Sequence, residues 1–406
     1  MVRRRGCRWL LVSAVLAAAS CAVGCAGGQD APAAAGTGGA GGKSSSGGSG
    51  GTGISGSSSG GTGGSSGTGG SSGTGGSSGT SGGGGSGSGG SSGSSSGGSG
   101  GSSGAGGCGL PILMMTAPAT LSATGLYADI AKGTIAPQAL PYTPRFPLWS
   151  DGAEKKRWLA LPACGAIDTS NMDVWSFPIG TRVWKEFDVG GVRVETRLVH
   201  RYGPAATDYL FAAYVWRADQ TDADYVETGA QGVLGTTHDV PSTIQCNKCH
   251  TKAPERILGV SALQLGTSSA GLTVASLAKA GLLSAPPAKT TFDPPGSAVD
   301  VAALGYLHAN CGNCHNETDV KPLNLRVSVA DTTVKGTKLY TTSVGVVGEW
   351  VSPGITHVVT PGDPLSSSLS QRMAVRGSDA QMPPFASNEV DMAGLDAVSA
   401  WIKTLP

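Results

Sequence analysis

The pattern C-x-x-C-H occurs twice in this chain, and it constrains the folded molecule more than any other stretch. The first copy, C-N-K-C-H, spans 246–250, and the second, C-G-N-C-H, spans 311–315. Each copy places two thiols and an imidazole on one turn of backbone. That arrangement attaches a c-type haem, because the thiols bond to the two vinyl groups and the histidine becomes the proximal iron ligand. The sequence therefore predicts two covalently bound haems (heme c, iron).

Each predicted haem takes three residues from its own copy of the pattern. Haem 1 is bonded to Cys246 and Cys249, with His250 as proximal ligand; haem 2 is bonded to Cys311 and Cys314, with His315 as proximal ligand. Two other uses of paired cysteines fit less well. The interval between the pairs far exceeds the roughly 15–20 residues of a zinc ribbon. A thioredoxin-like pair needs a βαβ pattern that we do not find, and neither alternative accounts for the histidine after both pairs.

Residues 1–24 have the composition of an export signal peptide. Arginines crowd the beginning of the chain, and the apolar run at 9–19 is too short to span a bilayer. The A-V-G-C that ends at Cys25 resembles a bacterial lipoprotein processing site, which makes Cys25 the lipidated residue, although such sites usually carry Leu where Ala22 stands. Cys21 is a weaker rival for lipidation, and secretion without lipid is the alternative.

Residues 25–107 are predicted to be a disordered tether, because a composition dominated by Gly and Ser cannot bury a core. A flexible chain of this length spans roughly 50 Å. We therefore expect an exported protein, periplasmic or on the cell surface, with a lipid anchor as its contact with a membrane. Ala26 after the lipidated cysteine favours the outer membrane, by analogy with lipoprotein sorting. The formal net charge of +1 gives no indication of a nucleic-acid partner.

Two cysteines remain once the signal peptide, the lipid and the haems have been assigned. They are Cys108 and Cys164. An even remainder in an oxidising compartment predicts a disulfide between them, which would attach the start of the ordered region to the first module. Two unpaired cysteines are the alternative.

Residues 108–245 are predicted to form a β-rich module. The segments 181–188 and 192–201 alternate in character and are separated by Gly190 and Gly191, which supply a tight hairpin turn. The segment 208–218 is typical of a more buried strand. An antiparallel sandwich or a small sheet follows. Five tryptophans in this module favour core packing over a haem-covering or ligand-binding surface.

The first haem-binding segment, 246–298, offers no distal ligand of its own. We predict no helix leading into the first motif and two short helices after it. Neither Met nor His occurs between His250 and Gly305. A sixth ligand for haem 1 must therefore come from elsewhere, or the position is open. The candidates are His200, His238, His308, His357 and Met172.

The segment 299–406 has the parts of a complete haem domain: a helix running into Cys311, a last helix with Asp391 as its N-cap, and the loop Q-M-P-P at 381–384. This arrangement resembles the all-α class I cytochrome c domain. The resemblance implies that the first and last helices cross with Gly305 against Trp401. It also makes Met382 the distal ligand of haem 2, in preference to Met373 and Met392.

A wider resemblance covers 140–406. Its markers include F-P-L-W-S-D-G at 146–152, V-P-S-T-I-Q-C-N-K-C-H at 240–250 and M-P-P at 382–384. Together they resemble a poorly characterised bacterial family of dihaem c-type cytochromes, which implies haem binding and electron transfer without a known substrate.

The sequence thus predicts an α+β multidomain chain: a β module followed by a cytochrome c-like domain. The expected function is electron transfer in the cell envelope, between a donor and an acceptor protein that are not known, without catalytic residues. Two alternatives stay open. One is a dihaem peroxidase-like enzyme whose first haem has an open distal face, and the other is a tethered binding or sensor module.

Overall fold

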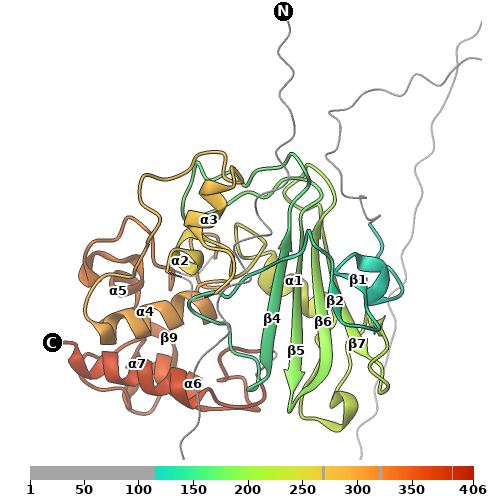
Figure 1. Cartoon of the computed structure of the whole chain (residues 1–406). Coiled ribbons are helices and arrows are strands. Elements are labelled where there is room, and N and C mark those ends of the chain that lie inside the picture. The colour runs from blue at the N-terminus through green and yellow to red at the C-terminus, as the bar shows by residue number, and fades with distance from the viewer. Residues whose placement is uncertain (1–114, 268–269, 320–321, 386) are drawn as a thin grey trace, which may run out of the picture. The chain divides into compact units, whose positions relative to one another are not determined.

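The structure, a computed structural model, describes residues 115–406 except 268–269, 320–321 and 386 (Figure 1). These residues all belong to one compact unit, and the predicted domain boundaries near 245 and 298 fall inside it. The predicted signal peptide, the tether, Cys25 and Cys108 lie outside the described residues.

A six-stranded antiparallel sheet is the largest element, and its strands lie side by side in chain order. They are β3 (Leu140–Pro141), β4 (Glu154–Ala160), β5 (Arg182–Val189), β6 (Val192–Arg201), β7 (Tyr209–Trp216) and β8 (Ala223–Tyr225). The predicted hairpin is confirmed as β5–β6. Its two turn residues, Gly190 and Gly191, have φ of 61° and 85°, the positive values that a tight two-residue hairpin turn requires.

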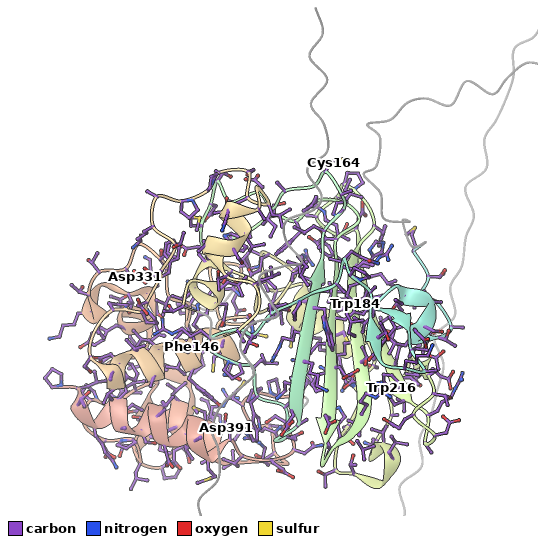
Figure 2. The ribbon with its side chains drawn as sticks, viewed as in Figure 1. Phe146, Cys164, Trp184, Trp216, Asp331 and Asp391 are labelled. Atoms are coloured by element: carbon purple, nitrogen blue, oxygen red, sulfur yellow. The ribbon has the colours of Figure 1, made fainter. Side chains whose placement is uncertain are left out.

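Both faces of this sheet are buried. One face packs against the 3₁₀ helix η1 (Leu121–Thr124) and the small sheet of β1 (Tyr127–Asp129) and β2 (Thr134–Ile135) (Figure 1). Trp184 and Trp216 lie in this layer (Figure 2). The other face contributes Leu159, Val183 and Phe211 to a core shared with the helices. The β module and the helical part are therefore joined by one hydrophobic core.

The remaining elements surround the other face of the sheet and follow it in the chain. They are η2 (Val233–Gly235), α1 (Thr243–His250), α2 (Ala262–Leu265), α3 (Val274–Lys279), α4 (Ala298–Asn310), η3 (Val334–Gly336), α5 (Lys338–Ser343), β9 (Val347–Ser352), β10 (Ile355–His357), α6 (Ser368–Ala374) and α7 (Met392–Thr404). The two long helices begin at side-chain caps. Ser297 and Asp300 form a capping box on α4, and the Asp391 carboxylate accepts the Gly394 N–H at 3.0 Å. The predicted Asp391 cap is confirmed.

Helices α4 and α7 approach each other closely at a glycine of α7. Gly394 of α7 lies against the ring of Tyr306 of α4, where a Cβ would collide with that ring. At this approach the aromatic side chain comes from α4 and the small residue from α7. A Cβ built on Gly305 of α4 would meet the ring of Phe146. The Phe146 ring supplies the atoms nearest to Gly305, and the contact of Gly305 with Trp401 stays a prediction.

The α+β class is confirmed, but two details of the helical part differ from expectation. The segment 299–406 contains the antiparallel pair β9–β10 besides its helices, so an all-α domain is not what the fold shows. The prediction that no helix leads into the first C-x-x-C-H is wrong, because α1 begins three residues before Cys246. Among the described residues, no helix combines the length and apolar composition needed to cross a bilayer.

Candidate functional site

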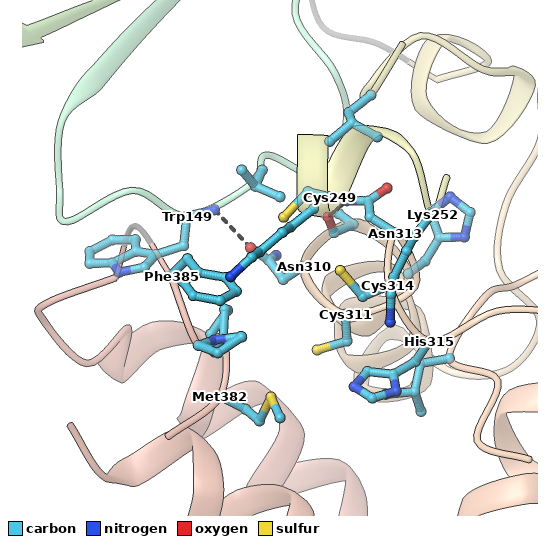
Figure 3. A pocket seen from close by; sticks show the side chains of 18 of the residues that line it. Trp149, Cys249, Lys252, Asn310, Cys311, Asn313, Cys314, His315, Met382 and Phe385 are labelled. Carbon is cyan, nitrogen blue, oxygen red and sulfur yellow. Dashed lines mark hydrogen bonds between the residues drawn. The ribbon is translucent and has the colours of Figure 1, made fainter. Parts of the chain in front are cut away.

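Both C-x-x-C-H motifs line one cavity of about 970 Å³ between the sheet and the helices (Figure 3). Its walls come from α1, the end of α4, the 382–385 loop and strands β4 to β6. The volume is at the upper end of the about 300–1,000 Å³ typical of cofactor and ligand sites. All six predicted cysteine and histidine haem residues, and Met382, are among the lining residues.

The first motif is held by a capped helix. The Ser242 hydroxyl accepts the Gln245 N–H at 3.3 Å, and the Gln245 side chain accepts the Ser242 N–H at 2.9 Å. This capping box fixes the start of α1, so that Cys246, Cys249 and His250 follow within two turns. The S-x-x-Q pattern at 242–245 is the sequence signal for this helix, and the expectation of no helix here overlooked it.

His250 is oriented as a metal-binding histidine would be. Its Nδ1 donates to the Arg256 carbonyl oxygen at 2.6 Å, so Nε2 keeps its lone pair. Its ring packs on Phe211 with centroids 4.6 Å apart. Burial lowers the pKa of His250 to about 4; the positive charges of Lys185 and Arg197 act in the same direction, and the Arg256 hydrogen bond opposes them. The imidazole is therefore neutral, which is the ligating form.

The second motif follows directly from α4. Cys311 is the C-cap of α4, and its N–H donates to the Leu307 carbonyl at 2.9 Å. The motif then turns, with the His315 N–H donating to the Cys311 carbonyl at 2.9 Å. The Nδ1 of His315 lies 3.6 Å from the Asp319 carboxylate. Asp319 in turn lies 3.6 Å from the ammonium of Lys252, which follows the first motif in the chain. A carboxylate beside the ring nitrogen is a common orienting partner for a ligating imidazole.

The two motifs are neighbours in space. The thiols of Cys249 and Cys314 interact with each other, and this interaction raises the pKa of Cys249 and lowers that of Cys314. Figure 3 shows both sulfurs on the same wall of the cavity. The two motifs are far apart in the sequence but lie close together in the fold, so the two predicted haem positions are adjacent.

Met382 enters the cavity from the loop before α7. Its N–H donates to the Arg372 carbonyl at 3.0 Å, and its side chain points to the side on which Cys311 and His315 lie (Figure 3). Farther along this loop, Phe385 lies 4.3 Å from the Lys248 ammonium of the first motif. Met373 also lines the cavity, whereas Met392 is 59% exposed at the start of α7.

Two residues of the cavity rim, Trp149 and Asn310, were not predicted as part of the site. The Trp149 N–H donates to the Asn310 side-chain oxygen at 2.7 Å (Figure 3), and the Asn310 amide donates to the Pro147 and Tyr306 carbonyls at 3.3 Å and 3.1 Å. This network attaches the 146–150 segment to the end of α4. The two stretches F-P-L-W-S at 146–150 and A-N-C at 309–311 are distant in the sequence, and these hydrogen bonds join them in the fold.

Of the five proposed distal ligands of haem 1, the structure brings only His308 to the cavity wall. His200 hydrogen-bonds to the Thr181 carbonyl, His238 to Glu195 and His357 to Thr356, while Met172 packs on the main core. The Nδ1 of His308 accepts the Val327 N–H at 3.1 Å, so its proton is on Nε2. Burial, with the nearby charge of Arg326, lowers its pKa to about 3. In this tautomer His308 is a hydrogen-bond donor.

Two further sequence expectations concern metals and the disulfide. Within the described ranges, no group of three or more His, Cys, Asp or Glu side chains is arranged to hold a metal ion. A haem does not require one, since its motif supplies a single imidazole to the iron. Cys164 is disulfide-bonded, while the four motif cysteines are free. Because Cys108 lies outside the described residues, its pairing with Cys164 stays a prediction.

Comparisons with protein-family models, with curated proteins and with solved structures returned no match.

Proposed function

We propose that this chain is a dihaem c-type cytochrome that transfers electrons in the cell envelope. The observation that carries the proposal is that both C-x-x-C-H motifs and Met382 line one cavity of about 970 Å³. A bound c-type haem supplies one-electron redox chemistry, and the protein sets its ligation, its burial and its surroundings. Adjacent motifs favour electron exchange between two haems over two independent sites.

The residues divide into two sets. Cys246 and Cys249 would hold haem 1, with His250 as proximal ligand. Cys311 and Cys314 would hold haem 2, with His315 and Met382 as axial ligands. The crossing of α4 and α7 supports a class I-like cytochrome c domain at 299–406, with β9–β10 as an addition to it.

The location and the partners are part of the same proposal. Export by residues 1–24, lipidation at Cys25 and the 25–107 tether would hold the haem domain near a membrane, and an oxidising envelope suits a Cys108–Cys164 disulfide. Electrons would come from a donor protein and pass to an acceptor protein, neither yet known. Membership of the dihaem c-type cytochrome family named above is proposed on the motifs alone.

Covalent haem content tests the proposal directly. The chain, expressed in a host with c-haem maturation machinery, should carry two haems by intact mass and by pyridine haemochromogen absorbance. The Cys246→Ala/Cys249→Ala and Cys311→Ala/Cys314→Ala double variants should each carry one, because each loses one pair of thioether bonds. A Cys164→Ala variant, which keeps all four motif cysteines, is the control and should keep two. A wild-type protein that carries no covalent haem would refute the proposal.

A peroxidase-like enzyme is the second candidate function. The positions of the candidate distal ligands of haem 1 are the observation in its favour. Only His308 of the five candidates lines the cavity, and it has its proton on Nε2. Low-temperature EPR of the ferric protein separates the two functions. Two low-spin species would exclude an open resting haem, whereas one high-spin and one low-spin species with peroxide turnover would establish the enzyme.

A further inference from the structure

The sheet presents a row of three basic side chains to the cavity. Arg157 on β4 pairs with Lys185 on β5, and Lys185 pairs with Arg197 on β6, each directly across from the next. All three line the cavity. Side chains directly opposite on neighbouring strands lie about 4.5–5.5 Å apart at Cβ, and like charges in such positions repel one another. We call these three residues the basic row.

The basic row carries more positive charge than its protein partners neutralise. Arg197 forms a two-point ion pair with the fully buried Glu195, at 2.5 Å and 2.8 Å. That carboxylate is shared with His238 at 2.7 Å. In the described part of the chain, no carboxylate pairs with Arg157 or Lys185. Among the residues that the structure describes, the Arg157 guanidinium donates only to the Lys155 carbonyl, at 3.5 Å.

Such a row is costly without a counter-ion. Arg157 is only 8% exposed. Burial lowers the pKa of Arg157 and, together with repulsion from Arg157 and Arg197, lowers that of Lys185 well below its usual range. Removing a cation from water costs several kcal/mol unless an anion is close. A cavity wall with this charge is therefore built to face negative groups.

The row faces the first motif. Helix α1 lies against the sheet, and the His250 ring packs at a tilt on Phe211 of β7. The charge of Arg197 acts on both thiols of this motif, Cys246 and Cys249. In the second motif, Cys314 is influenced instead by Lys252 and Asp319. A group bonded to the first pair of cysteines would lie in the cavity that the row also lines.

We propose that the basic row binds carboxylate groups, and that these are the propionates of the haem attached at Cys246 and Cys249. This inference rests on the proposed function. Arginine recognises carboxylates with two parallel hydrogen bonds, and Lys185 adds a point charge between the two guanidinium groups. The row neutralises the propionates and thereby favours the ferrous state of haem 1. A free anion that enters the cavity has the same chemistry and is the other possible source.

The test removes the charge of Lys185 and leaves Arg197, because Arg197 is the ion-pair partner of the buried Glu195. In the dihaem protein, Lys185→Met should lower the reduction equilibrium constant of haem 1 about tenfold, which corresponds to about 59 mV for one electron. Arg157→Met should act in the same direction, and Lys185→Arg should restore the wild-type value. The potential of haem 1 should also become pH-dependent in the weak-acid range, because a propionate without its cation protonates more readily. The potential that moves with Met382 variants identifies haem 2.

Lys156→Met is the matched control. Lys156 is the chain neighbour of Arg157 on β4 and carries the same charge as Lys185. Its side chain is 65% exposed and lies 3.8 Å from Glu186, so the potentials of both haems should stay unchanged. With ¹³C-labelled haem carboxylates, redox infrared difference spectra should show propionate bands that move in Lys185→Met and stay in the control.

The two sources of carboxylate give opposite results. If a free anion is the ligand, acetate or phosphate at constant ionic strength will shift the wild-type Soret band saturably, this shift will be lost in Lys185→Met, and the labelled bands will not move. That result overturns the propionate assignment. Unchanged potentials and bands in both row variants overturn the inference altogether, while two bound haems in the same samples leave the proposed function standing. Absence of covalent haem from the wild type refutes the function itself.

Discussion

Replacing Met382 with histidine should lower the potential of haem 2 by on the order of a few hundred millivolts, because axial ligands set haem potentials over about 0.8 V. A thioether opposite imidazole stabilises ferrous iron, and a second imidazole does so less. Met382 lies in the cavity that His315 also lines. Spectroelectrochemistry measures the change, and the loss of the near-infrared sulfur-to-iron band accompanies it.

Met373→Leu is the control for this experiment. Met373 also lines the cavity and is 5% exposed, but it lies on α6 instead of the loop before α7. Its replacement should leave both potentials and the sulfur band intact. The assignment of Met382 is wrong if Met373→Leu abolishes the band and Met382→His does not.

Removing Arg326 should destabilise the fold by about 3–5 kcal/mol, because an uncompensated carboxylate would remain buried. The Arg326 guanidinium forms two hydrogen bonds to Glu255, at 2.9 Å and 3.2 Å, and a third to the Asp173 carbonyl at 3.1 Å. Both partners of the ion pair are at most 10% exposed. Urea unfolding of Arg326→Met against wild type measures the loss.

The expected loss of stability comes from the burial of the Glu255–Arg326 ion pair. An exposed ion pair elsewhere in the chain tests this explanation. Arg217 and Asp224 form a similar two-point pair at 2.9 Å and 2.6 Å, but their side chains are 42% and 54% exposed. Arg217→Met should therefore change stability little. Adding Glu255→Gln to Arg326→Met should recover part of the loss. An equal loss at both arginines, or no recovery, would contradict the argument.

Local patterns predicted much of the fold. The Gly190-Gly191 turn, the strand that became β7, the helix that runs into Cys311 and the Asp391 cap all depend on nearby residues, and all are confirmed. The helix α1 was missed although its signal was also local: Ser242 and Gln245 have capping-box spacing.

The parts that were not predictable depend on contacts between distant segments. Alternation along β6 separates Arg197 from Leu198, but it does not show that both faces of the strand are buried. The choice of Phe146 as the neighbour of Gly305 depends on a segment from the other end of the described chain. Nor did the spacing of the two motifs indicate that Cys249 and Cys314 meet. These are tertiary relations, and single-sequence periodicity carries no information about them.

The shared cavity has a consequence for assembly. The four motif thiols are directed toward the interior, between a sheet that is already buried on its opposite face and helices that continue its core. If the chain carries two haems, as proposed, their attachment is expected before the sheet and the helices close around the cavity. The haems would then fill part of the interior, and their attachment would be coupled to the folding of the chain.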